Sequence, residues 1–154
     1  MHELAQNTKS ALFSLCQQYV KQRIDTARQA MEAAQEAANS ESKSSAGDKY
    51  ETGRAMAQLE RDRNAQLLAG ALQLERDLQQ ITIDKTYESV QPGSIVTTNR
   101  GAYFISIGAG KLLLGDDAYF GVSAGSPIAV ALAGRKAGEV AAFNKMMYEV
   151  LSVV

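Results

Sequence analysis

Apolar positions recur every three or four residues along two stretches of the first half of the chain. In the first stretch, from about residue 3 to residue 38, they are Phe13, Cys16, Val20, Ile24, Ala27, Met31, Ala34 and Ala38. In the second stretch the same spacing is kept by Met56, Leu59, Arg63, Leu67, Ala71, Leu74, Leu78 and Ile81, of which Arg63 is the one polar residue. Residues 40–47 between them are rich in Ser and contain Gly. Coiled-coil spacing on both sides of a break predicts an antiparallel hairpin of two helices, each about 50 Å long.

The pattern changes after Ile81, where β-branched and aromatic residues become more frequent and turns interrupt them. Strands are expected at residues 95–98, 103–107, 112–114, 119–122, 139–143 and 147–153. Ser126 and Pro127 form an N-cap and first turn for a short helix that Gly134 closes. The chain is therefore expected to be an α+β protein. Residues 1–82 are predicted to be the hairpin, with its tip at about 39–49, and residues 86–154 a small antiparallel sheet of about five strands with one helix.

Composition narrows the function classes. The chain has 154 residues, with 16 basic against 17 acidic side chains, so any nucleic-acid contact is expected to be local. One cysteine permits no internal disulfide, the start does not resemble a signal peptide, and the apolar run 118–134 contains a turn. We therefore expect a soluble, cytoplasmic protein with no membrane partner. Cys16 is expected to be a core residue because the sequence has one histidine, His2, near the chain start.

The segment Ser123–Val140, which contains Ser126-Pro127-Ile128-Ala129, resembles the closing part of the bacterial Gre transcript-cleavage factors. The hairpin segment Tyr50–Arg54 is similar to the region that follows the tip in that family. The resemblance implies an FKBP-like C-terminal domain that docks on RNA polymerase and a hairpin that enters its secondary channel. It implies no active site in the chain itself, no small-molecule substrate, and at most stimulation of the polymerase's own cleavage of transcripts.

The tip departs from the family pattern. Where the family has two acids that help to hold a Mg²⁺ ion in the polymerase active site, alignment on Tyr50 places Lys43 and Ala46. Nearby carboxylates are candidates to replace them: Glu41, Asp48 and Glu51. Asp48 and Glu51 are also candidate ligands of that shared Mg²⁺ ion, although their position as acids in the first turn of a helix is the favoured explanation of both. The chain either promotes cleavage or occupies the channel without cleavage, and the missing acids favour the second.

Other candidates follow from the same resemblance. The residues expected at the polymerase-docking surface are Asp116, Asp117, Ser123, Ser126 and Pro127. Arg54 and Arg61 are candidates to contact the channel or the 3′ end of the nascent RNA, although pairing with acidic neighbours is the alternative. Arg63 is expected to snorkel or to pair with an acid on the first helix. A polar turn is the alternative explanation of the two aspartates. Two further function classes remain: an FKBP-like chaperone and a coiled-coil adaptor.

Overall fold

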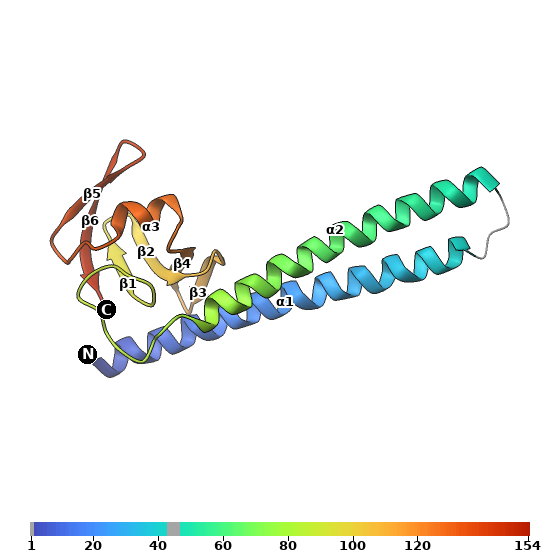
Figure 1. Cartoon of the computed structure of the whole chain (residues 1–154). Helices are drawn as coiled ribbons and strands as arrows, with labels where there is room; N and C mark the ends of the chain where they lie inside the picture. Colours follow the sequence, from blue (N-terminus) through green and yellow to red (C-terminus); the bar gives the residue numbers. More distant parts are fainter. Residues whose placement is uncertain (1, 43–46) are drawn as a thin grey trace. The chain divides into compact units, whose positions relative to one another are not determined.

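The computed structural model describes residues 2–42 and 47–154, and the side chains of residues 3–40 and 51–154. The chain divides into two compact units. Unit 1 combines Met1–Tyr19 with Arg76–Val154, and unit 2 is the inserted segment Val20–Glu75. Both long helices, α1 (His2–Ser42) and α2 (Gly47–Gln79), therefore contribute residues to each unit (Figure 1). The sequence pattern assigned both helices wholly to the hairpin, whereas the units group the start of α1 and the end of α2 with the sheet.

Unit 2 is an antiparallel pair of helices, as the spacing predicts. Asn64 on α2 donates from Nδ2 to the backbone oxygen of Ala30 on α1, at 3.4 Å. Arg61, one turn earlier on α2, donates from Nη1 to Oε1 of Gln35, which lies later on α1, at 3.2 Å. The expected seam of α1 is confirmed, because its buried positions in this unit are Val20, Ile24, Ala27 and Ala34. No helix of the described chain combines the length and the apolar character needed to cross a bilayer.

The expected seam of α2 is wrong from Met56 to Leu67. Met56, Leu59 and Leu67 have relative exposures of 63%, 60% and 57%, and so lie outside the seam. The covered positions are instead Gly53, Ala57, Arg61, Asn64, Leu68 and Ala71. From Ala57 onward their steps alternate between four and three residues, which is stricter coiled-coil spacing than the predicted set had. Small and polar residues occupy this seam. The prediction was based on the largest apolar side chains, which lie on a different, exposed face of α2.

Unit 1 contains a sheet with the strand order β3-β4-β2-β1-β6-β5, six strands among the described residues. Its elements are β1 (Ile95–Thr98), β2 (Gly101–Ser106), β3 (Gly110–Leu114), β4 (Asp117–Ser123), helix α3 (Pro127–Leu132), β5 (Val140–Phe143) and β6 (Met146–Val153). The predicted strand positions are confirmed to within two residues. The last hairpin turns at Asn144 and Lys145, whose φ values of 50° and 63° are those of a type I′ turn.

One pairing corrects the expectation of an antiparallel sheet. β4 runs parallel to β2, because the chain leaves β2, forms β3 at the sheet edge and returns between them. Gly121 on β4 permits this return: a Cβ atom there would lie 3.1 Å from the Cβ of Ala109 and 3.1 Å from the oxygen of Ile107. The amide of Ala109 also donates to the oxygen of Gly121 at 3.2 Å. The connection from β2 to β3 therefore packs directly against β4.

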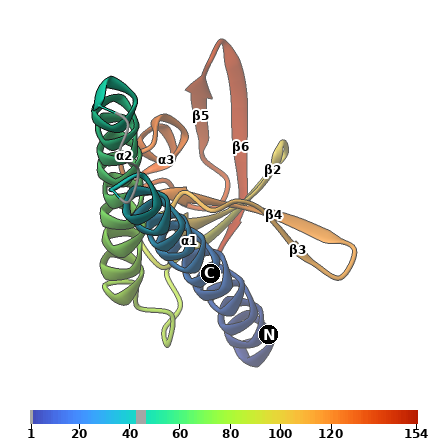
Figure 2. The ribbon, with the colours of Figure 1, turned by 90° about the vertical axis from the view of Figure 1, so that its right-hand side faces the viewer.

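The sheet has two different faces. The face covered by α3, here called the α3 face, holds the core cluster of Val90, Val96, Ile105, Ala129, Leu132, Ala141, Tyr148 and Val150. The opposite face is called the α1 face, because residues from the start of α1 pack on it. There Cys16 Sγ lies 3.8 Å from the hydroxyl oxygen of Ser106, and both residues are buried. Figure 2 shows the β3–β4 hairpin extending beyond the part of the sheet that α3 covers.

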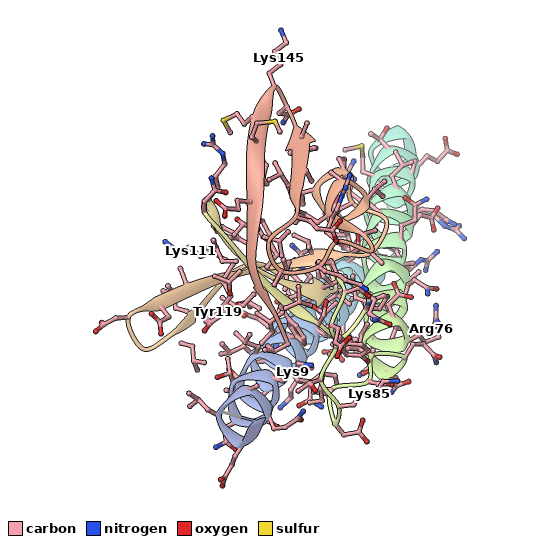
Figure 3. The ribbon with its side chains drawn as sticks, turned by 90° about the vertical axis from the view of Figure 1, so that its left-hand side faces the viewer. Lys9, Arg76, Lys85, Lys111, Tyr119 and Lys145 are labelled. Atoms are coloured by element: carbon pink, nitrogen blue, oxygen red, sulfur yellow. The ribbon has the colours of Figure 1, made fainter. Side chains whose placement is uncertain are left out.

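The segment between α2 and β1 is fixed by a buried lysine. Lys9 on α1 is fully buried, and its Nζ atom donates to the backbone oxygen of Lys85 at 2.7 Å (Figure 3). The same Nζ atom lies 4.7 Å from the ring centroid of Tyr87, which in turn donates its hydroxyl to the oxygen of Thr82 at 3.0 Å. Burial lowers the pKa of Lys9 from 10.5 to about 8. The ammonium group of Lys9 is thus held against the segment between α2 and β1, and its burial costs part of its solvation free energy.

Candidate functional site

The structure describes the side chain of one of the three candidate acids at the hairpin tip. Glu41 lies in α1 and Asp48 in α2, but their side chains lie outside the described residues, as do those of Lys43 and Ala46. Glu51, in the second turn of α2, is exposed. A hard cation such as Mg²⁺ needs several oxygen ligands, so Glu51 alone does not make a site. Among the described residues no group of three or more His, Cys, Asp or Glu could hold a metal ion.

The arginines of α2 have different environments from those expected. Arg63 is exposed, with 70% of its side chain accessible, and pairs with Glu60 on its own helix at 3.5 Å. The expectation that it lies in the seam and pairs with the first helix is therefore wrong. Arg61 occupies the seam and bonds to Gln35 on α1, which leaves it less free to reach a nucleic acid. Arg54 is exposed near the start of α2 and remains available for a contact.

The Ser126-Pro127 helix start has the expected geometry. Ser126 adopts an extended backbone conformation, and its hydroxyl oxygen accepts from the amide of Ala129 at 3.4 Å. The same hydroxyl donates to the oxygen of Ser123 at 2.8 Å, so the cap also ties α3 to the end of β4. Pro127 is exposed in the first turn, where it sacrifices no hydrogen bond. The Ser126 side chain is therefore committed to the cap, and Ser123 and Pro127 present the accessible surface of this loop.

The expected docking residues do not form one cluster. Asp116 lies in the turn between β3 and β4, and Asp117 begins β4. Ser123 ends the same strand, six residues later, which at about 3.3 Å per residue places it about 20 Å from Asp117. Ser126 and Pro127 follow directly after Ser123. The structure therefore brings the serines and the proline together, and it places the two aspartates at the other end of β4.

A second surface in unit 1 was not predicted from the sequence. Tyr103 on β2 and Phe120 on β4 form a tilted ring pair on the α3 face, with centroids 5.9 Å apart. Phe120 is 37% exposed, and Leu113 on β3 is 60% exposed on the same face. The alternation of side chains along β4 could have indicated that the Phe120 ring points outward. The parallel pairing of β4 with β2, which places Tyr103 beside Phe120, was not predicted. This surface is a candidate site in addition to the two ends of β4.

Cys16 is buried, as expected of a core residue. Burial raises the pKa of its thiol, while a hydrogen bond with Ser106 acts in the opposite direction to a smaller extent. Such a thiol is a poor nucleophile at neutral pH. The described structure therefore gives Cys16 a packing role between α1 and β2.

Comparisons with known proteins include a likeness to a solved structure. No model of a known protein family matches the chain, and no curated protein matches it. Among solved structures, the chain is similar to GreA factor homolog 1 (Gfh1) of Thermus thermophilus, with 20% sequence identity and a TM-score of 0.36. The match covers 88% of this chain and 92% of that chain. The predicted order of elements, a hairpin followed by a small sheet with one short helix, is confirmed by the structure itself.

Proposed function

We propose that this chain is an RNA polymerase accessory factor of the Gre type that acts in the cytoplasm. Its sheet unit docks on the polymerase, and its hairpin enters the secondary channel to modulate elongation or the fate of backtracked RNA. The chain is not itself an enzyme and has no resident cofactor. Any Mg²⁺ at the tip is shared with the polymerase active site.

One observation carries this proposal. The segment whose sequence resembles the family pattern, Ser123–Val140, begins at the last residue of β4, forms the capped helix α3 and leads into β5. Its most specific part, Ser126-Pro127, therefore has a defined geometry with an exposed proline beside the cap. A loop that a tight cap holds in one conformation is suited to docking, because little conformational entropy is lost when it binds.

The hairpin supports the proposal independently. Met56, Leu59 and Leu67 lie within about 80° of one another around α2, at 100° per residue, and all are largely exposed. Isolated exposed apolar residues are common, but three on one helix face beside a complete seam suggest a surface that a partner covers. The wall of a channel is such a partner. The exposed Arg63 lies within the same arc and would contact the same wall.

The chemistry at the tip favours a factor that occupies the channel without cleavage. The family acid positions correspond to Lys43 and Ala46, neither of which ligates Mg²⁺. Glu51 is exposed but needs Asp48 or Glu41 beside it to reproduce a pair of carboxylates. A cleaving factor remains the alternative form of the proposal, and the two forms are separated by the RNA products.

Binding is tested first. Core RNA polymerase from the same cell is captured on the immobilised chain, and capture is expected from wild type. Because Asp116 and Pro127 lie at opposite ends of β4, Asp116→Ala and Pro127→Ala are tested separately, with Glu88→Ala as an exposed carboxylate control. Loss of capture in one variant identifies the end of β4 that docks. No capture by the wild-type chain would refute the proposal and favour the adaptor.

Cleavage is tested on stalled, backtracked elongation complexes. A non-cleaving factor releases no short 3′ RNA fragments and competes with a known cleavage factor for the complex. If fragments are released, the replacement of Glu41, Asp48 and Glu51 together by Ala should abolish the release. Replacement of Asp25, Glu32 and Glu36 by Ala, on the exposed side of α1, is the control with the same change in charge. Release that survives the tip replacement would exclude these three acids as its source.

A further inference from the structure

The α3 face of the sheet has an uncovered region over β2, β3 and β4. It is built around the Tyr103–Phe120 ring pair. Gly101, on the same face two residues before Tyr103, adds no side chain: a Cβ atom there would lie 3.9 Å from Phe120 Cε2 and 3.8 Å from the Tyr103 hydroxyl. The rings therefore keep an open flank toward the turn between β1 and β2. We call the surface formed by Tyr103, Phe120, Lys111 and Arg100 the ring platform.

The ring platform is bordered by cations. Lys111 pairs in register with Phe120, which pairs in register with Tyr103, so the three side chains form one row across β3, β4 and β2. Lys111 is exposed (Figure 3). Arg100 precedes Gly101 in the turn, donates from Nε to the oxygen of Met147 at 2.9 Å, and lies over the ring of Tyr148, with its Cζ atom 5.7 Å from the ring centroid. These contacts fix the arginine beside the open flank of the rings.

No carboxylate of strands β1 to β4 points to this face. The residues that register places there are Val96, Thr98, Gly101, Tyr103, Ile105, Lys111, Leu113, Ala118, Phe120 and Val122. Asp117 alternates with Ala118 and so lies on the α1 face with Tyr119, whose pKa is raised by burial and, to a smaller extent, by the charge of Asp117. Helix α3 contributes no charged side chain. On this face of the four strands the charged side chains are therefore basic, although the turn between β3 and β4 carries Asp116 and the whole chain has a net charge of −1.

We propose that the ring platform binds a short segment of single-stranded RNA. Unpaired bases stack on exposed aromatic rings of a sheet, and Lys and Arg at the border neutralise the phosphates. Strands are about 4.8 Å apart, so the row from Lys111 to Tyr103 spans about 10 Å, which accommodates a stacked base and its phosphate. A protein surface would also cover Phe120 and Leu113, but the basic side chains of Lys111 and Arg100 beside the rings fit a polyanion better.

This site goes beyond the proposed function, because it lies wholly in unit 1 and its test needs no polymerase. Fluorescence anisotropy is measured on the full chain with a labelled single-stranded RNA of about ten nucleotides, the size range of such sites. We expect binding that weakens as salt is raised. A duplex of the same sequence should bind more weakly, because its bases are not free to stack.

Adjacent residues provide matched variants. Phe120→Ala is expected to weaken RNA binding by at least about fivefold, which corresponds to the loss of one stacked base. Tyr119→Ala removes a neighbouring aromatic ring from the opposite face of the same strand and should leave binding unchanged. Lys111→Glu should weaken binding and flatten its salt dependence, whereas Lys21→Glu, with the same charge change on the exposed side of α1, should not. Far-UV circular dichroism confirms that each variant is folded.

Three outcomes would overturn the proposal. They are an absence of RNA binding by the wild-type chain, equal losses in Phe120→Ala and Tyr119→Ala, and equal affinity for duplex and single strand. If RNA does not bind but Phe120→Ala abolishes polymerase capture, the ring platform is a protein-docking surface instead. If RNA binds and polymerase is not captured, the RNA site stands and the proposed function fails.

Discussion

The buried lysine of α1 makes a quantitative prediction about stability and pH. In the folded chain the pKa of Lys9 is about 8, against an ordinary value of 10.5, because burial removes its ammonium group from water. Below about pH 8 the group is charged in both the folded and the unfolded chain. Between about pH 8 and 10.5 the unfolded chain binds more protons, so the free energy of unfolding rises with pH across this window.

The size of this rise follows from the two pKa values. Their difference of about 2.5 corresponds to about 3 kcal/mol at 1.36 kcal/mol for each pKa unit. Three tyrosines act in the opposite direction, because burial raises the pKa values of Tyr87, Tyr103 and Tyr119 above 10.0. Their contribution to stability is lost as the pH rises above about 10. The effect of Lys9 is therefore read from the difference between wild type and Lys9→Met, in which the terms of Tyr103 and Tyr119 cancel. Tyr87 contacts Lys9, and its term enters only above about pH 10.

The assay is urea unfolding followed by circular dichroism at intervals from pH 7 to 10.5. The stability of the wild type relative to Lys9→Met should increase by about 3 kcal/mol over this range. Lys21→Met, at an exposed position on the same helix, should show no such increase. A difference between wild type and Lys9→Met that is independent of pH would refute the reasoning. It would mean that the ammonium group keeps its ordinary pKa despite its position.

Four further predictions concern the fold and are checked by thermal unfolding. Gly70 is exposed in α2 with open space around it, so Gly70→Ala should stabilise by up to about 1 kcal/mol and raise Tm by about 2–4 °C. Gly115 has equally open space but a φ of +64°, so Gly115→Ala should lower Tm; an equal response at both sites would contradict this account. Asn64→Leu should raise Tm. It should also allow more than one register between α1 and α2, which would broaden the distance distributions between spin labels on the two helices. Ser126→Ala should cost about 1 kcal/mol through loss of the α3 cap, and an unchanged Tm would show that the cap is dispensable.

The sequence predicted those parts of the fold that depend on local pattern. The cap at Ser126, the turn at Asn144 and the strand positions follow from residues whose backbone preferences are strong. The parallel pairing of β4 with β2 could not be predicted in this way. It depends on contact between segments far apart in the sequence, and the one local sign was Gly121, whose close neighbours are visible only in the folded chain.

The candidate site was predictable to a smaller extent. The α2 seam was misassigned because Ala57 and Asn64 carry no apolar signal as strong as that of Leu59, although they have the stricter spacing. Asp116 and Ser126 are close in the chain, but an extended strand separates them, so proximity in sequence was a poor guide to a shared surface. To predict the ring platform one must know which strands are neighbours in the sheet, and the sequence alone does not show this.

Unit 1 is assembled from both ends of the chain, and this has a consequence for how the protein is made. As the polypeptide leaves the ribosome, residues 20–75 are complete before most of the sheet has been synthesised, so the hairpin can close first. Leu12 and Cys16 are apolar residues near the start of the chain, and β2, whose Ser106 contacts Cys16, emerges only later. Until then this stretch of α1 is exposed nascent chain, and it is the segment on which a chaperone that acts during translation would be expected to bind.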